Sequence, residues 1–468
     1  MKKLTALLLA LLLVLGGLAA LAEAEPTGNE ELELVDELDQ IDASGLPELS
    51  DLEFAEVDDL LPGEAVSLEP EDESNASKGV KISSANFPDA AFRKYVKAQY
   101  DANKNGYLSS DETDGVTGMW LGVEEGYTKV NCKNVKGIRY FPNLEELFII
   151  GSADTTLPLT SLDVSKNAKL VKLYVCFTKL SSLNVSKNAE LVELNVGTNK
   201  LTKLTLGKQK NLATLVCDTN KLTALDVTGC PALNYLQCEK NQLTKLDVSK
   251  CTGLETLICW ENKLAKLNVT NNKALQALDC GANRISALNV SKNTKLFSLQ
   301  CSGNQLTKLD LRNNREIDNL NADYNRLTAL DVSKNTKLEE LYCEHNKLTK
   351  LDVSKNTRLV VLWCYDNALK ALNVSNNTKL VNLHCGKNKL TAIDVSKCKK
   401  LQTLYSEAND ITKVDIAKLP VYLRNLARKS GFEVEDGLLY NIPEEGKGFC
   451  FDASIQLYDG SRRIYPTA

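Results

Sequence analysis

The segment Leu212-Ala-Thr-Leu215-Val-Cys217-Asp-Thr-Asn220-Lys-Leu222-Thr-Ala-Leu225-Asp-Val227 decides the fold, because it recurs along the chain every 21 residues. One period later the same positions hold Leu233, Leu236, Cys238, Asn241, Leu243, Leu246 and Val248. Self-similarity at a period of about 20 to 50 residues is the signature of a solenoid, in which stacked units bury one another's apolar faces.

The cysteine position recurs from residue 175 to residue 406 without an insertion and defines twelve units. Cysteine fills eight of them, and Val175, Val196, Ala322 and Ser406 fill the rest; the eight are Cys217, Cys238, Cys259, Cys280, Cys301, Cys343, Cys364 and Cys385. The Leu-x-Cys spacing places both side chains on one face of a short strand, which we expect to point inward. Stacked thiols at the strand spacing lie too far apart for disulfides, so we expect a ladder of buried free thiols.

Other cysteines leave their pairing open. Cys230 and Cys251 stand on adjacent units at a corner, where a disulfide remains an alternative. The sequence does not assign a state to Cys132, Cys176, Cys398 or Cys450 either.

The repeat resembles the leucine-rich-repeat superfamily, L-x-x-L-x-L-x-x-N-x-L, with cysteine in place of the third leucine. It is similar to the cysteine-bearing, internalin-like proteins of bacterial surfaces, and the resemblance covers residues 159–416. The asparagine of the motif is present in every unit from Asn199 to Asn409. We expect its amide to satisfy backbone groups left open by the bend, and stacked copies to form a ladder.

We expect a mainly β leucine-rich-repeat solenoid of about twelve coils, with parallel strands on both faces and little helix, since the linking segments are short for a helix. The expected domain order is a signal peptide (1–22), an acidic disordered tether (23–80), an EF-hand-like calcium module (81–118), an N-terminal cap (119–158), the solenoid (159–416) and a C-terminal α/β cap (417–468). In that last cap we expect a helix over 417–429 and strands over 432–440 and 449–458.

Charge separates the start of the chain from the rest. Lys2 and Lys3 precede the apolar run Leu4–Leu15, a pattern typical of a cleaved signal peptide, and no second stretch is long enough to span a membrane. From Glu23 to Glu73 there are 20 acidic residues and no Lys or Arg, whereas the chain after Ser77 has 54 basic and 41 acidic residues, a net charge of +13. We expect a secreted or surface-associated monomer with a solvated acidic tether; a tether that folds back onto the basic body is the alternative.

A calcium loop is predicted before the repeats. Residues 82–100 favour a short helix, with Asn86 as its cap, and the next twelve residues, Asp101 to Glu112, match an EF-hand loop. Gly106 permits its sharp turn, and the expected ligands are Asp101, Asn103, Asn105, Tyr107 through its carbonyl, Ser109 and Glu112. Two amides in place of carboxylates predict weak affinity, and the pattern resembles a module that precedes leucine-rich repeats in secreted proteins of gut bacteria.

The outward positions beside the inward cysteine vary from unit to unit, and two of the three tryptophans and both histidines fall there. We interpret this face as the binding site for an extracellular protein; the candidate contact residues are Tyr235, Trp260, Tyr324, Tyr342, His345, Trp363, Tyr365, His384 and Tyr405. A glycan that stacks on the rings is the alternative, and a spacer without a ligand is a third. The lysine rows elsewhere favour a solvated surface, so nucleic acid is not expected, and no nucleophile, phosphate-loop or zinc motif indicates an enzyme.

Overall fold

The computed structural model describes residues 79–123, 127–411 and 419–421, together with six short strands beyond Asp410. The chain divides into two units, Met1–Pro70 and Glu71–Ala468, and every described residue belongs to the second. The predicted signal peptide and almost all of the predicted tether lie outside the described residues, as does most of the helix predicted over 417–429. Within the described part, no helix is sufficiently long and apolar to cross a bilayer.

The N-terminal module is held to the first coils by a helix cap. Helix α2 (Ala90–Tyr100) is followed by the single-turn α3 (Ser110–Thr113), and η4 (Ile138–Tyr140) is a 3-10 turn. Asp89, not the predicted Asn86, caps α2: one carboxylate oxygen accepts from the amides of Ala91 and Phe92, and the other from the amide of Lys133. The prediction failed because Asn86 instead donates to the carbonyl of Lys81.

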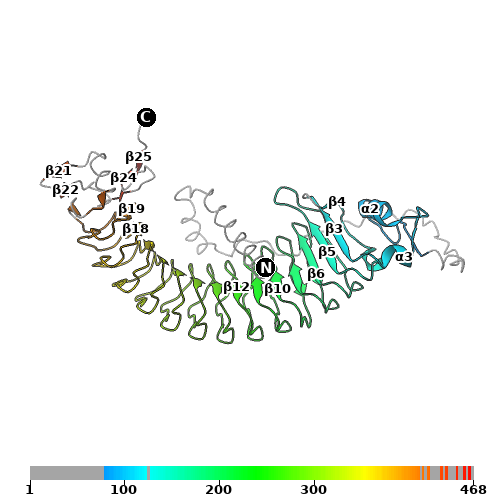
Figure 1. Cartoon of the computed structure of the whole chain (residues 1–468), viewed down its shortest axis with the longest axis horizontal. Coiled ribbons are helices and arrows are strands. Elements are labelled where there is room, and N and C mark those ends of the chain that lie inside the picture. The colour runs from blue at the N-terminus through cyan, green and yellow to red at the C-terminus, as the bar shows by residue number, and fades with distance from the viewer. Residues whose placement is uncertain are drawn as a thin grey trace, which may run out of the picture. The chain divides into compact units, whose positions relative to one another are not determined.

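One long sheet carries the solenoid. Its strands lie side by side on the inner edge of the curved row of coils (Figure 1). In spatial order they are β4 (Thr128–Lys129), β3 (Gly118–Gly122), β5 (Glu146–Ile150), β6 (Lys172–Cys176), β8 (Glu193–Asn195), β10 (Thr214–Val216), β11 (Tyr235–Gln237), β12 (Thr256–Ile258), β13 (Ala277–Asp279), β14 (Ser298–Gln300), β15 (Asn319–Asn321), β16 (Glu340–Tyr342), β17 (Val361–Trp363), β18 (Asn382–His384), β19 (Thr403–Tyr405) and β23 (Cys450–Phe451).

All pairings from β3 to β19 are parallel, and β23 closes the end in antiparallel orientation. From Leu173 to Leu404 the central leucines of twelve strands pair in a constant register of 21 residues, which makes eleven turns. This confirms a mainly β solenoid with parallel strands and little helix. The sheet also continues through β5 and β3 into the segment predicted as the N-terminal cap.

The strand leucines and the cysteine column form the core. Leu215 and Cys217 are fully buried, and the same holds for the equivalent residues along the stack. The described cysteines, which are all those of the chain except Cys450, are free and buried, so the predicted thiol ladder is confirmed and Cys230 and Cys251 are not bridged. Burial raises the pKa of Cys217 well above its ordinary value, so the thiols stay protonated and behave as small apolar side chains.

Parallel strands on both faces were predicted, and this is wrong for most of the stack. Among the described residues of the second side, only β7 (Ser182–Asn184) and β9 (Lys203–Thr205) pair as parallel strands, and Asn134–Ser161 and Leu267–Leu288 form isolated bridges. The outward Asp or Asn of this side accepts from a backbone amide two residues on, as Asp247 does from Ser249. Asn184 of β7 makes the same turn with Ser186, so this turn is compatible with strand pairing and does not by itself explain where pairing is lost.

The C-terminal region contains further short strands. Strands fall within both segments predicted for this region. Strands β21 (Glu433–Glu435) and β22 (Leu438–Tyr440) lie in the first of these segments, and β24 (Leu457–Asp459) begins in the second. Strands β20 (Val414–Asp415) and β25 (Arg462–Ile464) lie outside both. At the other end of the described chain, β1 (Val80–Lys81) pairs with β2 (Tyr107–Leu108).

The predicted asparagine ladder joins two successive coils at every step. The amide nitrogen of Asn220 donates to the carbonyls of Val196, Cys217 and Asp218 at 2.9, 3.2 and 2.9 Å, and its oxygen accepts from the amide of Leu201 at 2.8 Å. The same contacts recur at Asn241, Asn262 and onward to Asn409. The ladder thus satisfies backbone groups that the tight bend leaves without strand partners.

A second row of amides lines the opposite corner, and cysteine interrupts it. Asn272 donates to the carbonyls of Val248 and Cys251 at 2.9 and 2.7 Å. At the equivalent position Cys251 makes one thiol contact, with the carbonyl of Val227 at 3.6 Å. A thiol is a weak donor with one hydrogen, so this step of the row is held more weakly than its neighbours.

We predict that Cys251→Asn stabilises the protein, because the amide would donate to two carbonyls where the thiol reaches one. The expected gain in the free energy of unfolding is about 1 kcal/mol, measured by denaturant unfolding. The control is Cys238→Asn, which places the same amide in the inward thiol ladder and is expected to destabilise. An unchanged or lower midpoint for Cys251→Asn would contradict this account of the corner.

Candidate functional site

The last five parallel strands place aromatic side chains on the face of the sheet that points away from the core. In β15–β19 the central leucine points into the core, so the residues on either side of it point outward. The strand register puts Tyr342, Trp363, His384 and Tyr405 directly beside one another on neighbouring strands. A second outward row follows two residues later, beyond the inward cysteine, and includes Tyr365.

Seven of the nine predicted contact residues form one connected group, which we call the aromatic cluster. It consists of Tyr324, Tyr342, His345, Trp363, Tyr365, His384 and Tyr405. The ring centroids are 4.1 Å apart for Tyr324–His345, 5.3 Å for His345–Tyr365, 4.6 Å for Tyr365–His384, 6.1 Å for Trp363–His384, 5.2 Å for Tyr342–Trp363 and 5.2 Å for His384–Tyr405.

Two rings of the aromatic cluster remain open to solvent. Tyr324 is 59% exposed and Trp363 is 38% exposed, whereas the other members are half-buried. Large exposed rings held by neighbouring rings offer apolar area at little cost in conformational entropy, which is what the centre of an interface needs.

His384 sits at the middle of the aromatic cluster as a cation. Its Nδ1 lies 2.9 Å from Glu344 and its Nε2 lies 3.1 Å from Glu407. Both ring nitrogens therefore face carboxylates, which requires both to carry a proton. Burial of the imidazole opposes its charge, but the contacts with Glu344 and Glu407 outweigh it and raise the pKa to about 9.

The remaining carboxylates of this face are poorly compensated. Burial raises the pKa of Asp323 to about 7, although its oxygen accepts from the amide of Glu344 at 2.6 Å. Asp366 is different, because Lys387 lies 2.7 Å and His345 lies 3.1 Å from the same oxygen. Negative charge on the face is thus only partly neutralised by its own cations.

The other two predicted contact residues lie apart from the aromatic cluster. Tyr235 belongs to β11, and its hydroxyl donates to Gln237 at 2.8 Å. Trp260 follows β12, and the ammonium of Lys240 lies 4.9 Å from its ring centroid. Neither has a ring contact with the aromatic cluster, so the predicted set divides into one cluster and two separate positions.

A second aromatic row was not predicted. Trp120, Phe148 and Tyr174 occupy the same outward position on β3, β5 and β6, with centroid distances of 6.3 and 4.7 Å. The indole of Trp120 lies over Gly118, where a Cβ would meet the ring at 2.1 Å, so this row covers the sheet near its end. Phe148 and Trp120 stand 26 and 54 residues before Tyr174, so the 21-residue period does not reach them and could not have predicted this row.

The predicted calcium loop folds as a closed turn. Asp101, Asn103 and Asn105 each accept from a backbone amide within the loop, at 3.1, 3.0 and 2.7 Å. Glu112 joins the two ends, accepting from Ala102 at 2.9 Å and from Ser109 at 2.9 Å. Burial acts to raise the pKa of Glu112, but these hydrogen bonds outweigh it and lower the pKa.

The side chains at the predicted ligand positions offer oxygen atoms, which are the ligands that Ca²⁺ prefers. Tyr107 and Ser109 occupy the two remaining ligand positions. Only Asp101 and Glu112 among the predicted ligands are carboxylates. No group of three or more His, Cys, Asp or Glu with the geometry of a metal site is present among the described residues.

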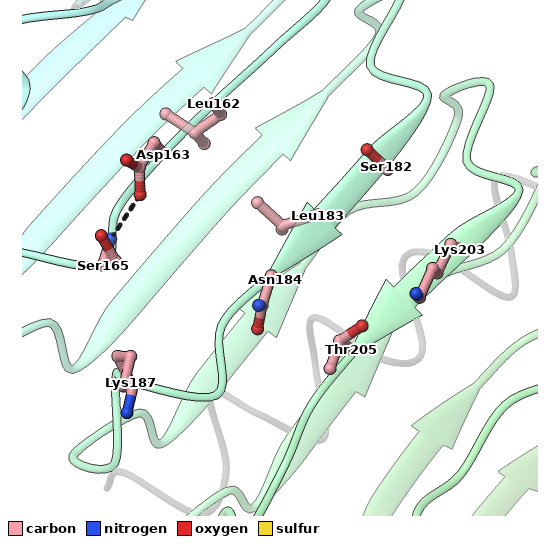
Figure 2. Close-up of a pocket in the computed structure, with 9 residues that line it drawn as sticks. All are labelled: Leu162, Asp163, Ser165, Ser182, Leu183, Asn184, Lys187, Lys203 and Thr205. Carbon is pink, nitrogen blue, oxygen red and sulfur yellow. Dashed lines mark hydrogen bonds between the residues drawn. The ribbon is translucent and has the colours of Figure 1, made fainter.

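On the other side of the coils, Leu162, Leu183 and Thr205 help to line a depression (Figure 2). Its polar residues are mostly exposed, and the hydrogen bond drawn there is the local turn of Asp163 with Ser165. We assign no ligand to it.

We predict that His384 titrates near pH 9 and loses this shift when Glu344 and Glu407 are both changed to Gln, as measured by NMR of the imidazole protons. Because the folded pKa lies above the ordinary value of 6.5, His384 stabilises the fold fully below pH 6.5 and loses this effect as the pH rises through 9. At neutral pH, His384→Asn is expected to cost on the order of 2 kcal/mol. A cost that did not shrink between pH 6 and pH 10 would rule out the charged contact.

Known proteins share this architecture. The functional domain of InlJ from Listeria monocytogenes, which includes a cysteine ladder, is 30% identical, with a TM-score of 0.56 and 74% of each chain covered. The internalin InlF of the same species is 21% identical, with a TM-score of 0.55, 69% of this chain and 96% of that chain covered. YopM of Yersinia pestis is 18% identical, with a TM-score of 0.51, 69% and 84% covered.

No protein-family model matches the chain, and no curated protein matches it either. The similarity to InlF and YopM shows the fold, whereas the similarity to InlJ extends to the sequence. With 30% identity over 74% of its length to the cysteine-ladder domain of InlJ, the chain belongs to the leucine-rich-repeat proteins related to the internalins.

Proposed function

We propose that the chain is an exported protein that binds an extracellular protein through the aromatic cluster, in contact with a host or with other cells. The observation that carries this proposal is the connection of seven outward rings over β15–β19, with Trp363 and Tyr324 left exposed at its surface. The strands behind the cluster are hydrogen-bonded to one another in register, so a partner would not have to order them. Membership in a family of surface and secreted binding proteins supports the same function.

Export is part of this proposal and rests on the sequence pattern of residues 1–22. The glycan alternative rests on the same rings, because Trp363 and Tyr365 could stack on sugar faces as well as on protein side chains. The two readings differ in the chemical class of ligand, which the following experiment identifies.

We predict that Trp363→Ala combined with Tyr365→Ala weakens partner binding by roughly 30-fold, since two central anchors together contribute about 2 kcal/mol or more. The full chain would be screened against purified extracellular proteins and a glycan array, and affinities would then be measured with the purified ligand. Phe297→Ala is the control, because Phe297 is 42% exposed and has no ring contact with the aromatic cluster.

A protein ligand lost only in the double variant supports the proposal. A ligand that binds the double variant as tightly as the wild type contradicts it. Binding confined to glycans, and lost in the double variant, supports the glycan alternative instead.

We further propose that the loop from Asp101 to Glu112 binds Ca²⁺ weakly and braces the entrance to the solenoid. The local hydrogen bonds of Asp101, Asn103 and Asn105 preorganise the turn, and Asp101 is only 5% exposed. The pairing of β1 with β2 fixes the second half of the loop. Bound Ca²⁺ would supply positive charge between Asp101 and Glu112.

We predict a calcium dissociation constant of about 10⁻⁴ to 10⁻³ M, the range of extracellular modules, measured by calorimetry on the full chain. About 10 mM Ca²⁺ should raise the unfolding temperature. Glu112→Gln should abolish both effects, whereas Asp111→Asn, an exposed neighbour outside the ligand positions, should leave them unchanged. Equal calcium binding by Glu112→Gln would remove the loop as the site.

A further inference from the structure

Carboxylates that make no salt bridge among the described residues lie on the sheet face, several coils before the aromatic cluster. We call Asp218, Glu239 and Asp279 the acidic row; they stand just beyond β10, just beyond β11 and at the end of β13. Glu239 is only 7% exposed. Its Oε1 accepts from Gln237 at 2.8 Å, but its Oε2 is buried without a hydrogen-bond partner among the described residues.

The pKa values of Glu239 and Asp279 are raised, because their buried positions disfavour the charged carboxylates. Burial, followed by repulsion from Asp218, raises the pKa of Glu239 to about 7. Burial alone raises that of Asp279 to about 6. An unpartnered buried acceptor and like charges on neighbouring strands are both relieved by a cation from outside the chain.

The chain itself shows how a cation fits this face. The ammonium of Lys240 lies 4.9 Å from the ring centroid of Trp260, and its charge acts on Asp218. Lys387 occupies the same repeat position seven coils later. It lies 5.9 Å from the ring centroid of Tyr365 and 2.7 Å from Asp366. In both places an ammonium near an aromatic ring also acts on a carboxylate, an arrangement stabilised by cation–π attraction and charge.

The two most exposed rings of the aromatic cluster, those of Tyr324 and Trp363, have no lysine placed over them in the described structure. Tyr324 stacks on His345, and Trp363 contacts Tyr342 and His384, but no ammonium is placed over either ring in the described structure. Asp323 directly precedes Tyr324, and Glu340 contacts Tyr342, the ring beside Trp363. The same chemistry is therefore available to a cation that comes from another molecule.

We propose that the partner protein contacts this face through a basic segment, whose arginine or lysine side chains lie beside the acidic row and over the exposed rings of Tyr324 and Trp363. The inference rests on the proposed function, because both place a partner protein on this face of the sheet. An organic cation fits better than a metal ion, since no described group of acidic or histidine side chains has the geometry of a metal site.

A basic segment should bind more tightly as the acidic row ionises. The charged groups that act on Glu239 are Asp218 and Asp279, and Lys240 acts on Asp218. A cation favours the ionised carboxylates, so its binding releases protons and strengthens between pH 5 and pH 8. Asp323, whose pKa is raised to about 7, contributes in the same direction.

The probe for this inference is an octa-arginine peptide, titrated into the full chain in about 0.15 M NaCl and followed by tryptophan emission. Trp260 and Trp363 lie on this face, and residues 23–77 contain no tryptophan, so peptide held by that acidic segment alone leaves the signal unchanged. We expect Glu239→Gln with Asp279→Asn to weaken binding at pH 8 about tenfold and to flatten its pH dependence. Circular dichroism checks that these near-isosteric variants fold.

The matched control is Asp331→Asn with Asp352→Asn, which removes the same charge from the other side of the coil while keeping each turn's acceptor oxygen. Equal weakening by both pairs, or none by the acidic-row pair, would overturn the inference. If the acidic-row pair has no effect while Trp363→Ala with Tyr365→Ala still weakens the partner, only this inference falls. If the aromatic pair leaves partner binding intact, the proposed function falls, and the inference with it.

Discussion

The asparagine ladder is the constraint on which the rest of the protein depends. Each ladder amide, such as Asn220, donates to carbonyls of its own coil and of the coil before it, and accepts from that preceding coil. A single coil therefore cannot satisfy its own bend, and the unit of stability is the stack. The residue before each ladder asparagine lies in the left-handed region, at φ between 46° and 60° from Thr198 to Ala408.

This left-handed column costs energy, because a non-glycine residue there is strained by roughly 1 kcal/mol. Glycine, which would relieve the strain, occupies only one of these positions, Gly303. The column instead carries Lys240, Tyr324, His345 and Lys387, which take part in the ring and charge contacts of the sheet face. Strain tolerated by the ladder thus holds side chains at the edge of the candidate binding surface.

The sequence predicted what depends on periodicity and missed what periodicity does not determine. Inward leucines and cysteines follow from a spacing of two along a strand, so the core and the thiol ladder were predictable. The outcome on the second side was not, because its sequence pattern recurs in every unit, whereas only β7 and β9 among the described residues pair there as parallel strands. Seven of the nine contact residues met because their positions repeat on adjacent strands, whereas Tyr235 and Trp260 lie on strands without aromatic neighbours. The contacts of His384 with Glu344 and Glu407 depend on side-chain conformations, which a repeat pattern in the sequence does not specify.

The constant register has a consequence for how such a protein can change in length. Removing or duplicating one whole unit, for example residues 243–263, returns every leucine, thiol and ladder amide to an equivalent neighbour. The aromatic cluster would stay intact, and its separation from the N-terminal helix module would change by one strand spacing, about 4.8 Å. The number of units therefore sets the length of the stack in steps of one strand spacing, whereas the aromatic cluster sets which partner is bound. These two properties can change independently of each other.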